Sequence, residues 1–448
     1  MEADCLVNSG IRWSPTRMAR IQNILARLRN AAKAPSPYHA LRWHTLRRQD
    51  LKAGKRILIC GAGIAGPTLG FWLHQYGYSV VIAEKAKAIR DGGQNVDIKG
   101  PGQDVIRRMG LAEQILAKNT QEQGQKYLDA NGRLIAALPI GSIGSLTSDF
   151  EILRGDFANI LYEATRASCE YRFGCYVSAL KQADEHVEVA FNDGSVEQFE
   201  LVVCADGIAS STRQMVLSEH THFHDFGAYM AFFKIPRRPE DDGWAWSING
   251  IGGTMITLRP GTTAETTVLV TFPKTAVRVE PSGTAESKAV LREALLGRGT
   301  VAERILAGMD QVRDLYFGPM CQVKVSTWSQ GRVVLLGDAG YCPTAFTGQG
   351  TVLSLVGAYV LAGEIKQHEQ VADAFAAYEQ RLRPLVEQTQ AQMSARLVTL
   401  LHVKSRAGIA LMRVLQRLIA SSPVQRLGKW LAGRAKQTAT PFQLPDYP

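Results

Sequence analysis

The first residues whose types and spacing predict a chemistry form a glycine-rich run, Gly61-Ala62-Gly63-Ile64-Ala65-Gly66. The run directly follows a short apolar strand pattern and opens a helical one. In that setting the first glycine allows a tight turn, the second lets the backbone approach a pyrophosphate, and the third lets the helix pack on the strand. The helix N-terminus adds free N–H groups that bind phosphates. Glu84, at the end of the next strand, is placed to accept hydrogen bonds from ribose hydroxyls, so the pattern predicts a dinucleotide site.

Two later turns also lie between a strand pattern and a helix pattern. Cys204-Ala205-Asp206-Gly207 precedes one helix, and Gly337-Asp338-Ala339-Gly340-Tyr341-Cys342-Pro343 leads to Gly348-Gln349-Gly350 at the start of another. Taken alone, an aspartate after a strand is often only a helix N-cap. An arginine such as Arg154, in Leu153-Arg154-Gly155-Asp156-Phe157, is often only a packing residue. The order and spacing of these motifs along one chain indicate a shared site instead.

Together the three motifs resemble those of the class A FAD-dependent monooxygenases, the aromatic-hydroxylase type with the para-hydroxybenzoate hydroxylase fold. The resemblance covers about residues 55–390. It is closest in pattern to the tetracycline-inactivating enzymes and to the fungal and actinobacterial flavin monooxygenases of secondary metabolism. Two positions depart from the family pattern, because Ala345 replaces a proline and Lys85 replaces an arginine after the ribose glutamate.

The resemblance implies an FAD site and assigns a part of it to each motif. The glycine run and Glu84 are expected to bind the ADP half of FAD, and Asp338 the ribityl chain. Asp206 and Gly207 are expected to contact both FAD and NADPH, and the backbone of 348–351 to face the pyrimidine edge of the flavin. The complete expected cofactor-binding set is Gly61, Gly63, Gly66, Glu84, Arg90, Asp97, Arg154, Asp206, Gly207, Asp338, Gly348, Gly350 and Thr351.

The resemblance further implies a reaction, an FAD-dependent oxidation that consumes NAD(P)H and O₂. Hydride passes from the nicotinamide to FAD, O₂ adds to the reduced flavin, and a flavin C4a-hydroperoxide hydroxylates or epoxidises the substrate. Arg213 and Tyr229 are the candidates for an acid–base role. A flavin-dependent dehydrogenase or reductase, or a halogenase on the same fold, is an alternative, and so is a non-catalytic FAD-binding or membrane-tethered partner protein.

The substrate is expected on a sheet within residues 223–272, which are rich in aromatic residues and threonine. Phe232, Trp244, Trp246 and Met255 are the candidate contacts, because such side chains suit an aromatic, polyketide or terpenoid molecule of secondary metabolism. The two tryptophans also resemble the pair of the flavin-dependent halogenases, but Asn249 stands where those enzymes have proline. Alternating residues share one face of a strand, so core packing is the other explanation for the pair.

The elements that position these residues predict a mixed α/β (α+β) fold. A strand over 56–60, a helix to about Tyr76 and a strand over 78–83 form a βαβ unit. Asn-Gly and Asp-Gly turns predict hairpins over 126–138 and 187–203. We expect a Rossmann-like FAD-binding domain, an inserted antiparallel-sheet substrate domain and C-terminal helices. The predicted boundaries are 1–52 for a basic extension, 53–220 and 326–390 for the FAD-binding domain, 221–325 for the substrate domain, and 391–448 for the helices.

Charge and cysteine content narrow the remaining possibilities. Of the net charge of +10, residues 1–52 carry +7, with ten Lys or Arg against three acids. The body of the chain therefore gives no reason to expect nucleic acid. A mitochondrial targeting helix is one interpretation of the extension, and a cytoplasmic protein with a solvated extension is the favoured one. Seven cysteines with no CxxC pair and no histidine at ligand spacing predict a reducing compartment, no disulfide and no metal site.

The last helical pattern, from about Ser394 to Gln437, has apolar residues at helical spacing and basic polar faces. A packing or dimer face is favoured over membrane association for it. No stretch of the sequence predicts a transmembrane segment. We therefore expect a monomer or homodimer whose partners are a small-molecule substrate and O₂.

Overall fold

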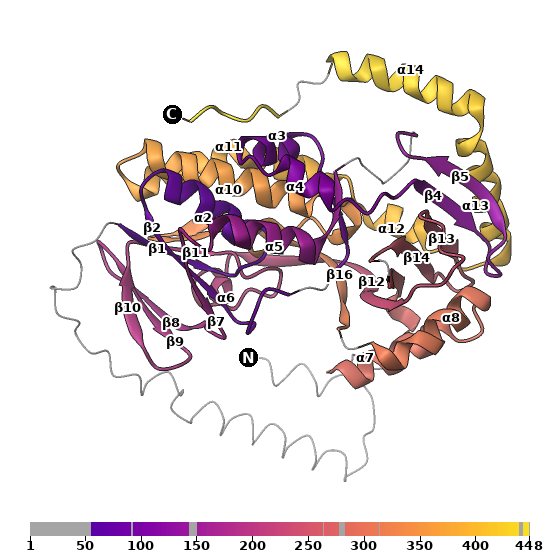
Figure 1. Ribbon diagram of the computed structural model, residues 1–448, viewed down its shortest axis with the longest axis horizontal. Helices are drawn as coiled ribbons and strands as arrows, with labels where there is room; N and C mark the ends of the chain where they lie inside the picture. The colour runs from indigo at the N-terminus through magenta and orange to yellow at the C-terminus, as the bar shows by residue number, and fades with distance from the viewer. Residues whose placement is uncertain are drawn as a thin grey trace, which may run out of the picture. The chain divides into compact units, whose positions relative to one another are not determined.

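The computed structural model describes residues 55–90, 93–142, 150–262, 264–276, 283–312, 314–438 and 442–447. These residues belong to one compact unit of the chain, 48–448. The predicted basic extension over 1–52, and with it the targeting hypothesis, lies outside the described residues. Figure 1 labels the helices and strands.

A mainly parallel sheet contains the strand that precedes the glycine run (Figure 1). Its strand order is β17-β18-β11-β1-β2-β7, and every neighbouring pair is parallel except β17 with β18. The inner strands are continuous apolar runs that are almost wholly buried, which is typical of a parallel sheet covered on both faces. The strands are β1 (Arg56–Cys60), β2 (Ser79–Glu84), β7 (Glu170–Phe173), β11 (Leu201–Cys204), β17 (Ser329–Gln330) and β18 (Val333–Leu335).

Helices pack around this sheet, and α10 is the most enclosed of them. It contacts α2, α3 and α11, and most of its residues are buried around the whole circumference. The longer helices of this region are α2 (Ala65–Gln75), α3 (Pro101–Arg108), α5 (Arg154–Thr165), α10 (Gly350–Gln367) and α11 (Val371–Ala391). Three shorter ones are α4 (Ala112–Ala117), α6 (Ser211–Leu217) and α9 (Asp338–Tyr341).

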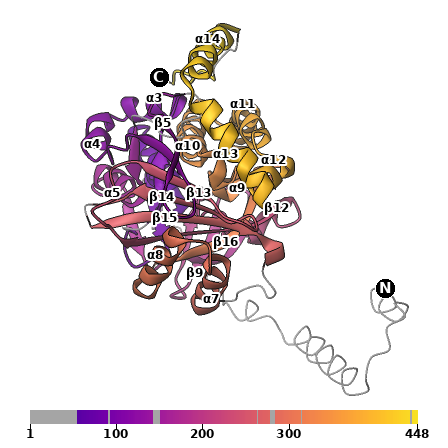
Figure 2. The same ribbon diagram turned by 90° about the vertical axis from the view of Figure 1, so that its right-hand side faces the viewer.

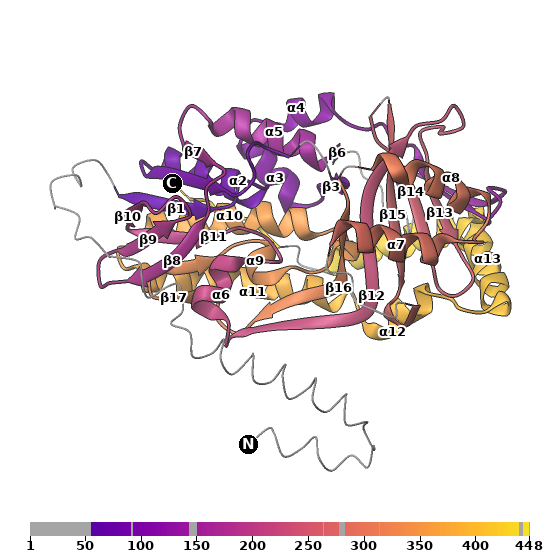
Figure 3. The same cartoon turned by 90° about the horizontal axis from the view of Figure 1, so that it is seen from below.

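A seven-stranded sheet forms the second large region, in the order β16-β12-β15-β14-β13-β4-β5. Its neighbours are antiparallel except for the parallel pair β13 and β4. The long strand β12 runs beside β16, which contacts α9 of the first region, so the two regions are directly connected (Figure 3). The strands are β4 (Gly124–Leu128), β5 (Leu134–Pro139), β12 (Thr221–Pro236), β13 (Ala245–Asn249), β14 (Met255–Pro260), β15 (Glu265–Pro273) and β16 (Tyr316–Val325).

Two helices, α7 (Thr284–Leu295) and α8 (Thr300–Gly308), cross one face of this sheet (Figure 3). Their apolar residues form one core with alternate strand residues such as Phe233, Leu258 and Val268. Because successive strand residues point to opposite faces, the intervening residues belong to the face away from α7 and α8, which we call the second face. Met230, Phe232 and Leu269 lie on it.

Smaller elements complete the fold. The strands β3 (Asn95–Asp97) and β6 (Glu151–Leu153) form a two-stranded ribbon, and β8 (Val177–Gln182), β9 (Val187–Phe191) and β10 (Val196–Phe199) form a small sheet. The C-terminal helices are α12 (Ala395–Leu401), α13 (Arg406–Ala420), which contacts β5, and α14 (Ser422–Thr438), which extends beyond the rest of the unit (Figure 2). Among the described residues, no helix combines the length and the apolar character that crossing a membrane requires.

The predicted mixed α/β fold is confirmed, with the βαβ unit and the hairpin over 126–138 in place. The hairpin predicted over 187–203 is too long. Only β9 and β10 pair in it, whereas β11 joins the parallel sheet beside β1. The reason is visible in the sequence, since Leu201–Cys204 is a continuous apolar run of the kind that both faces of a parallel sheet bury. The antiparallel sheet is also wider than residues 223–272, because β4, β5 and β16 join it.

Candidate functional site

The glycine run turns between β1 and α2 where space is limited by the protein itself. Gly61 has a φ of +112°, and a Cβ there would lie 2.5 Å from the carbonyl oxygen of Ala205. A Cβ on Gly66 would lie 2.0 Å from the carbonyl oxygen of Gly61. At Gly63, by contrast, the nearest atom to such a Cβ is Nη2 of Arg154, at 3.5 Å. Packing within the chain therefore requires Gly61 and Gly66, whereas Gly63 leaves space for a ligand.

Glu84 ends β2, and its carboxylate ties the glycine run to that strand. Its Oε2 accepts a hydrogen bond from the backbone N–H of Ala62 at 2.9 Å, and its Oε1 accepts one from Ala86 at 2.8 Å. Each carboxylate oxygen retains a second lone pair. The predicted ribose contact is therefore compatible with this positioning role.

Arg154 opens α5 and lies over the glycine run. Its backbone N–H donates to the carbonyl of Gln94 at 3.0 Å, and its side chain passes beside Gly93. Burial lowers the pKa of Arg154, while the nearby carboxylate of Asp338 acts in the opposite direction. Within the part of the chain that the structure describes, its guanidinium has no hydrogen-bond partner. Arg154 is thus a partly desolvated cation positioned to meet an anionic group.

Asp338 follows the strand β18 and lies beside the first residue of α10. A Cβ on Gly350 would lie 3.5 Å from Asp338 Oδ1. Burial raises the pKa of Asp338, and Arg154 lowers it. The alternative role as a helix N-cap does not describe this residue, because the N-cap of α9 is Gly337 and Asp338 is already helical. A hydrogen bond with the thiol of Cys342, at the end of α9, also lowers the pKa of Asp338, so the carboxylate lies between Arg154, the start of α10 and the end of its own helix.

The N-termini of α2 and α10 meet at this place. A Cβ on Gly337, just before α9, would lie 3.2 Å from Cβ of Ala65, the first residue of α2, and 3.0 Å from Oγ of Ser354 in α10, and α2 and α10 pack together. Neither helix has a side-chain hydrogen bond at its N-cap or an acidic residue in its first turn. Uncapped N-termini present free N–H groups and the positive end of the helix dipole. Together with Arg154 and the space at Gly63, this arrangement fits the pyrophosphate and the flavin of FAD.

Asp206, in the second motif, organises the start of α6. It accepts hydrogen bonds from Ser210 Oγ, Thr212 Oγ1 and, at 3.2 Å, the backbone N–H of Thr212. Gly207, with a φ of +85°, completes the turn. A Cβ on Gly61 would lie 3.0 Å from Asp206 Cα, so this turn supports the glycine run.

Arg213, a candidate for acid–base work, is completely buried in α6. Its Nη1 donates to the carbonyl of Ala339 at 2.7 Å and its Nη2 to that of Ile208 at 2.9 Å. The side chain therefore links the second motif to the third. This geometry supports a positioning role, since a guanidinium held by two carbonyls and inaccessible to solvent cannot exchange protons with a substrate.

A buried charge cluster connects the β3–β6 ribbon to the seven-stranded sheet. Arg259, on β14, donates through Nε to Glu122 Oε2 at 2.9 Å, and lies 3.3 Å from Asp97 Oδ2 and 3.0 Å from Glu151 Oε1. All three carboxylates are buried. Asp97, a member of the expected cofactor-binding set, thus has its carboxylate committed to Arg259. Sequence reasoning missed Arg259, Glu122 and Glu151, although a glutamate in the buried strand before Arg154 was a usable signal.

One carboxyl of this cluster, that of Glu151, has a pKa near neutral pH. Burial raises the pKa of Glu151 to about 7, against the pull of Arg259 and with the support of Glu122 and Asp97. Three carboxylates around one guanidinium would leave an excess of two negative charges in a buried place. The cluster therefore favours a proton on Glu151.

The four predicted substrate contacts do not lie together. Phe232 and Met255 belong to the second face, since their strand neighbours Phe233 and Ile256 point to α7 and α8. Trp246 is half-buried and packs against the core beneath α7 and α8, and Trp244 directly precedes β13 with Lys126 Nζ 5.1 Å from its ring centroid. The two rings line one small cavity, and Asp242 Oδ1 accepts from the backbone N–H of Trp244 and from Nε1 of Trp246, both at 3.4 Å, so the pair stays together but away from the second face.

Tyr229, the other acid–base candidate, also lies on the helix-covered face. Its ring is 5.1 Å from that of Phe317 and 6.0 Å from that of Phe272, and Lys274 Nζ is 4.9 Å from its centroid. The residue is buried. Its surroundings are those of a core aromatic residue on the face opposite Phe232.

The second face carries a tyrosine that sequence reasoning missed. Tyr316 starts β16, and its ring centroid is 6.0 Å from that of Phe232. The residue is 44% exposed, but desolvation of its hydroxyl raises the pKa to about 12, and Cys342, Cys321 and Asp338 act in the same direction. Phe346, two residues before Gly348, packs against the same apolar cluster as Phe232. The second face therefore approaches the start of α10.

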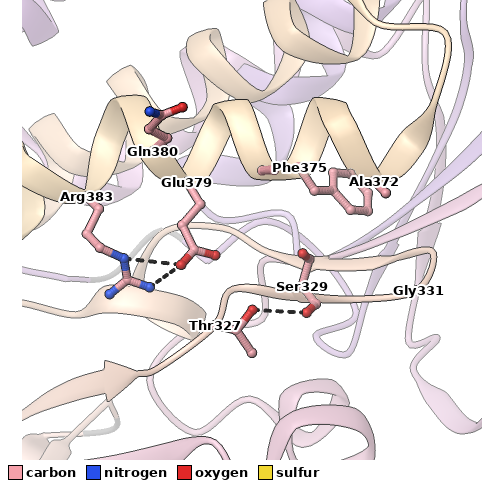
Figure 4. A pocket seen from close by; sticks show the side chains of 9 residues that line it. Thr327, Ser329, Gly331, Ala372, Phe375, Glu379, Gln380 and Arg383 are labelled. Atoms are coloured by element: carbon pink, nitrogen blue, oxygen red, sulfur yellow. Dashed lines mark hydrogen bonds and ion pairs between the residues drawn. The ribbon is translucent and has the colours of Figure 1, made fainter.

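A separate pocket of ≈ 460 Å³ lies between α11 and the segment around β17 (Figure 4). Two of its charged side chains, Glu379 and Arg383, are paired with each other. Glu379 also accepts from the backbone N–H of Trp328 at 2.8 Å, and Arg383 stacks on the Trp328 ring. The pocket contains none of the residues of the three motifs.

Other site types find no support among the described residues. No group of three or more His, Cys, Asp or Glu side chains there is arranged to hold a metal ion. The six described cysteines are all free thiols.

Comparison with known proteins gives one consistent result. A family described as an FAD binding domain matches residues 55–393. The FAD-dependent monooxygenase asL4 of Sarocladium schorii is 31% identical over 424 residues, which cover 88% of this chain and 98% of that protein.

Solved structures agree with this match. The tetracycline destructase Tet(51) is 32% identical, with a TM-score of 0.74 over 88% of this chain and all of that one (100%). Klebsiella pneumoniae HpxO, solved with FAD and uric acid, has a TM-score of 0.64 at 22% identity, over 81% of this chain and 92% of that one, and so supports the fold alone.

Proposed function

The chain belongs to the FAD-binding family of FAD-dependent monooxygenases, and from this membership we propose that it uses NAD(P)H and O₂ to hydroxylate or epoxidise a flat, polycyclic small molecule. It is an oxidoreductase whose cofactor is FAD. The proposed substrate class is an aromatic polyketide or a terpenoid of secondary metabolism. The proposal depends on one observation, that the uncapped starts of α2 and α10 meet Arg154 and Asp338 close to a sheet face carrying Phe232.

The residues of the three motifs have complementary roles in holding FAD. When bound, FAD supplies the electron transfer and the oxygen activation that side chains cannot provide. The glycine run and Glu84 would hold the adenosine and pyrophosphate, with Arg154 opposing the phosphate charge. Asp338 would hold the ribityl chain, and the N–H groups at the start of α10 would stabilise negative charge at the edge of the flavin.

The second face is the proposed wall of the substrate site. Phe232, Phe346 and Leu269 offer apolar contacts to a flat molecule and exclude water from the reacting atoms. Tyr316 stays protonated throughout the physiological range, because the ordinary pKa of a tyrosine hydroxyl lies near 10 and desolvation raises it further. It is therefore a hydrogen-bond donor for a substrate carbonyl or phenol oxygen. Met255, at the start of β14, is a further proposed substrate contact on this face.

Substrate-stimulated oxygen uptake tests the proposed reaction. The visible spectrum of the purified protein would be recorded first. NADPH and O₂ consumption would then be measured with a panel of phenolic polycycles. The panel includes tetracycline, the compound in the name of the tetracycline destructase Tet(51). We expect flavin bands, uptake that one panel member stimulates, and incorporation of labelled oxygen into its product. If no compound stimulated NADPH oxidation and no product contained labelled oxygen, the protein would be a flavin reductase and not a monooxygenase.

A pair of variants on α5 tests the cofactor contact. R154M should weaken FAD binding at least about tenfold, because a charge-assisted hydrogen bond contributes about 1.5–3 kcal/mol. R166M is the matched control, since Arg166 lies on the surface and pairs with Glu163. Equal FAD affinity of the two variants, measured by flavin fluorescence titration, would remove Arg154 from the site.

A further inference from the structure

The two last helices expose an unusual amount of apolar surface. Leu411, Val414, Leu415 and Leu418 of α13 are between 46% and 71% exposed. On α14, Val424, Leu427, Trp430 and Leu431 are between 42% and 57% exposed. A contiguous exposed apolar patch on a water-soluble surface indicates a partner or a lipid surface.

The leucines of α13 all lie on its outward side, whereas an ordinary surface helix buries such residues. Its buried positions are Ile409 and Gln416, and Gln416 donates to Asn249 of the seven-stranded sheet at 3.3 Å. Leu411, Leu415 and Leu418 are spaced four and three residues apart, so they share one stripe of the helix. That stripe faces solvent. The helix therefore contacts the body through Ile409 and Gln416 and presents leucines outward.

The same segment is strongly basic. Residues 391–448 contain nine Lys or Arg and one acid, Asp446, which gives a net charge of +8. Residues 53–390 contain 32 Lys or Arg and 37 acids, a net charge of −5. The basic side chains stand among the exposed apolar ones, at Arg406, Arg413, Arg417 and Arg426. Such a helix, with leucine and tryptophan on one side and arginine around them, matches the composition of helices that lie in a membrane interface.

We propose that α13 and α14 bind the surface of an anionic phospholipid membrane, with the leucines in the headgroup boundary and the arginines against the phosphates. The charge of this segment favours a membrane over the other candidate partners, a second copy of the chain and its own residues 1–52. A second copy would bring two segments of +8 together, and the chain's own residues 1–52, with +7, would be repelled in the same way. An anionic bilayer complements both the charge and the apolar stripe. The proposal concerns attachment and does not depend on which substrate the enzyme oxidises.

Vesicle sedimentation of the full-length holoenzyme tests this proposal. The vesicles would be phosphatidylcholine alone, or phosphatidylcholine mixed with phosphatidylglycerol. We expect binding to the mixed vesicles, little binding to phosphatidylcholine alone, and weaker binding as salt rises from about 0.1 M to about 0.5 M. The variant L415Q/L418Q should lower the partition coefficient at least about tenfold.

A matched control keeps the result specific to these helices. L116Q/L296Q also replaces two exposed leucines, 45% and 74% exposed, at the end of α4 and just after α7. It should bind as the unmodified protein does, and bound FAD and the thermal midpoint should show that both variants fold. Unchanged binding of L415Q/L418Q would place the attachment elsewhere, for example in residues 1–52. A concentration-dependent dimer that L415Q/L418Q abolishes, with no vesicle binding, would assign the stripe to a second copy instead.

Discussion

The carboxyl edge of the parallel sheet and the second face of the seven-stranded sheet differ in how their residues are positioned. At the first, Glu84 ends its own strand, and Asp206 and Asp338 follow theirs within three residues, so short-range chain geometry decides where each side chain lies. At the second, side chains alternate along the strands, and the helices α7 and α8, which lie outside the strands in the chain, decide which face is covered. The cofactor site is therefore local in origin, and the proposed substrate site is not.

The largest expected effect tests whether the short-range geometry of the glycine run determines the cofactor site. In G66A the new methyl group would lie 2.0 Å from the carbonyl oxygen of Gly61, so the turn cannot form and no soluble flavoprotein is expected. In G63A the nearest protein atom would be 3.5 Å away, so the chain should fold. Its methyl group would instead occupy the approach of the pyrophosphate and lower FAD affinity at least about tenfold.

Circular dichroism and flavin absorbance of both variants check this pair. Because Gly66 is needed for the fold and Gly63 for the ligand, G66A should lose the folded circular dichroism spectrum, whereas G63A should keep that spectrum and lose flavin absorbance. A G63A protein that keeps a full complement of FAD would mean that the backbone does not approach the cofactor at this position.

The second largest effect concerns the joint between the two regions. R259M removes the guanidinium from Asp97, Glu122 and Glu151 and leaves buried carboxylates without their cation. Breaking a buried ion pair costs about 3–5 kcal/mol of unfolding free energy. R292M, which breaks the exposed pair with Asp310, should cost less than about 1 kcal/mol. Similar urea midpoints for the two variants would show that the cluster does not hold the ribbon to the sheet.

These regions also explain how much the sequence could predict. The glycine run, Arg154 and Asp338 were found because a strand, a turn and a helix start lie within a few residues, where glycine and aspartate have few alternative uses. The positions of Trp246 and Tyr229 could not be found, because an alternating strand is equally consistent with either face until α7 and α8 are placed. The Arg259 cluster joins residues from three distant segments, and no local pattern links them.

The free energy of unfolding is expected to depend on pH because of the same buried charge cluster. Glu151 has an ordinary pKa of 4.5 that burial raises to about 7 in the folded protein, so the folded state binds its proton more tightly than the unfolded chain does. The stability that this group contributes is complete below about pH 4.5 and is lost as the pH rises through 7. The loss amounts to about 3 kcal/mol between pH 4.5 and pH 8.

The isosteric variant E151Q should not show this loss, because its side chain is neutral at every pH. Urea unfolding at pH 5 and at pH 8 measures the difference. We expect similar stabilities at pH 5 and a more stable variant at pH 8, whereas E163Q, on the exposed side of α5, should follow the unmodified protein. Parallel profiles of E151Q and the unmodified protein would mean that Glu151 is ionised throughout.

The smallest expected effect tests the two faces of the seven-stranded sheet directly. W246A removes a ring packed beneath α7 and α8 and should cost about 2–3 kcal/mol of stability, with substrate affinity unchanged. F232A removes a ring from the second face, where it should cost about 1 kcal/mol of stability and raise the KM for the polycyclic substrate about tenfold with little change in kcat. Both variants should keep FAD, since neither residue belongs to the three motifs. If W246A raised the KM and F232A left it unchanged, the substrate would lie between the sheet and α7–α8, and Trp246 rather than Phe232 would contact it.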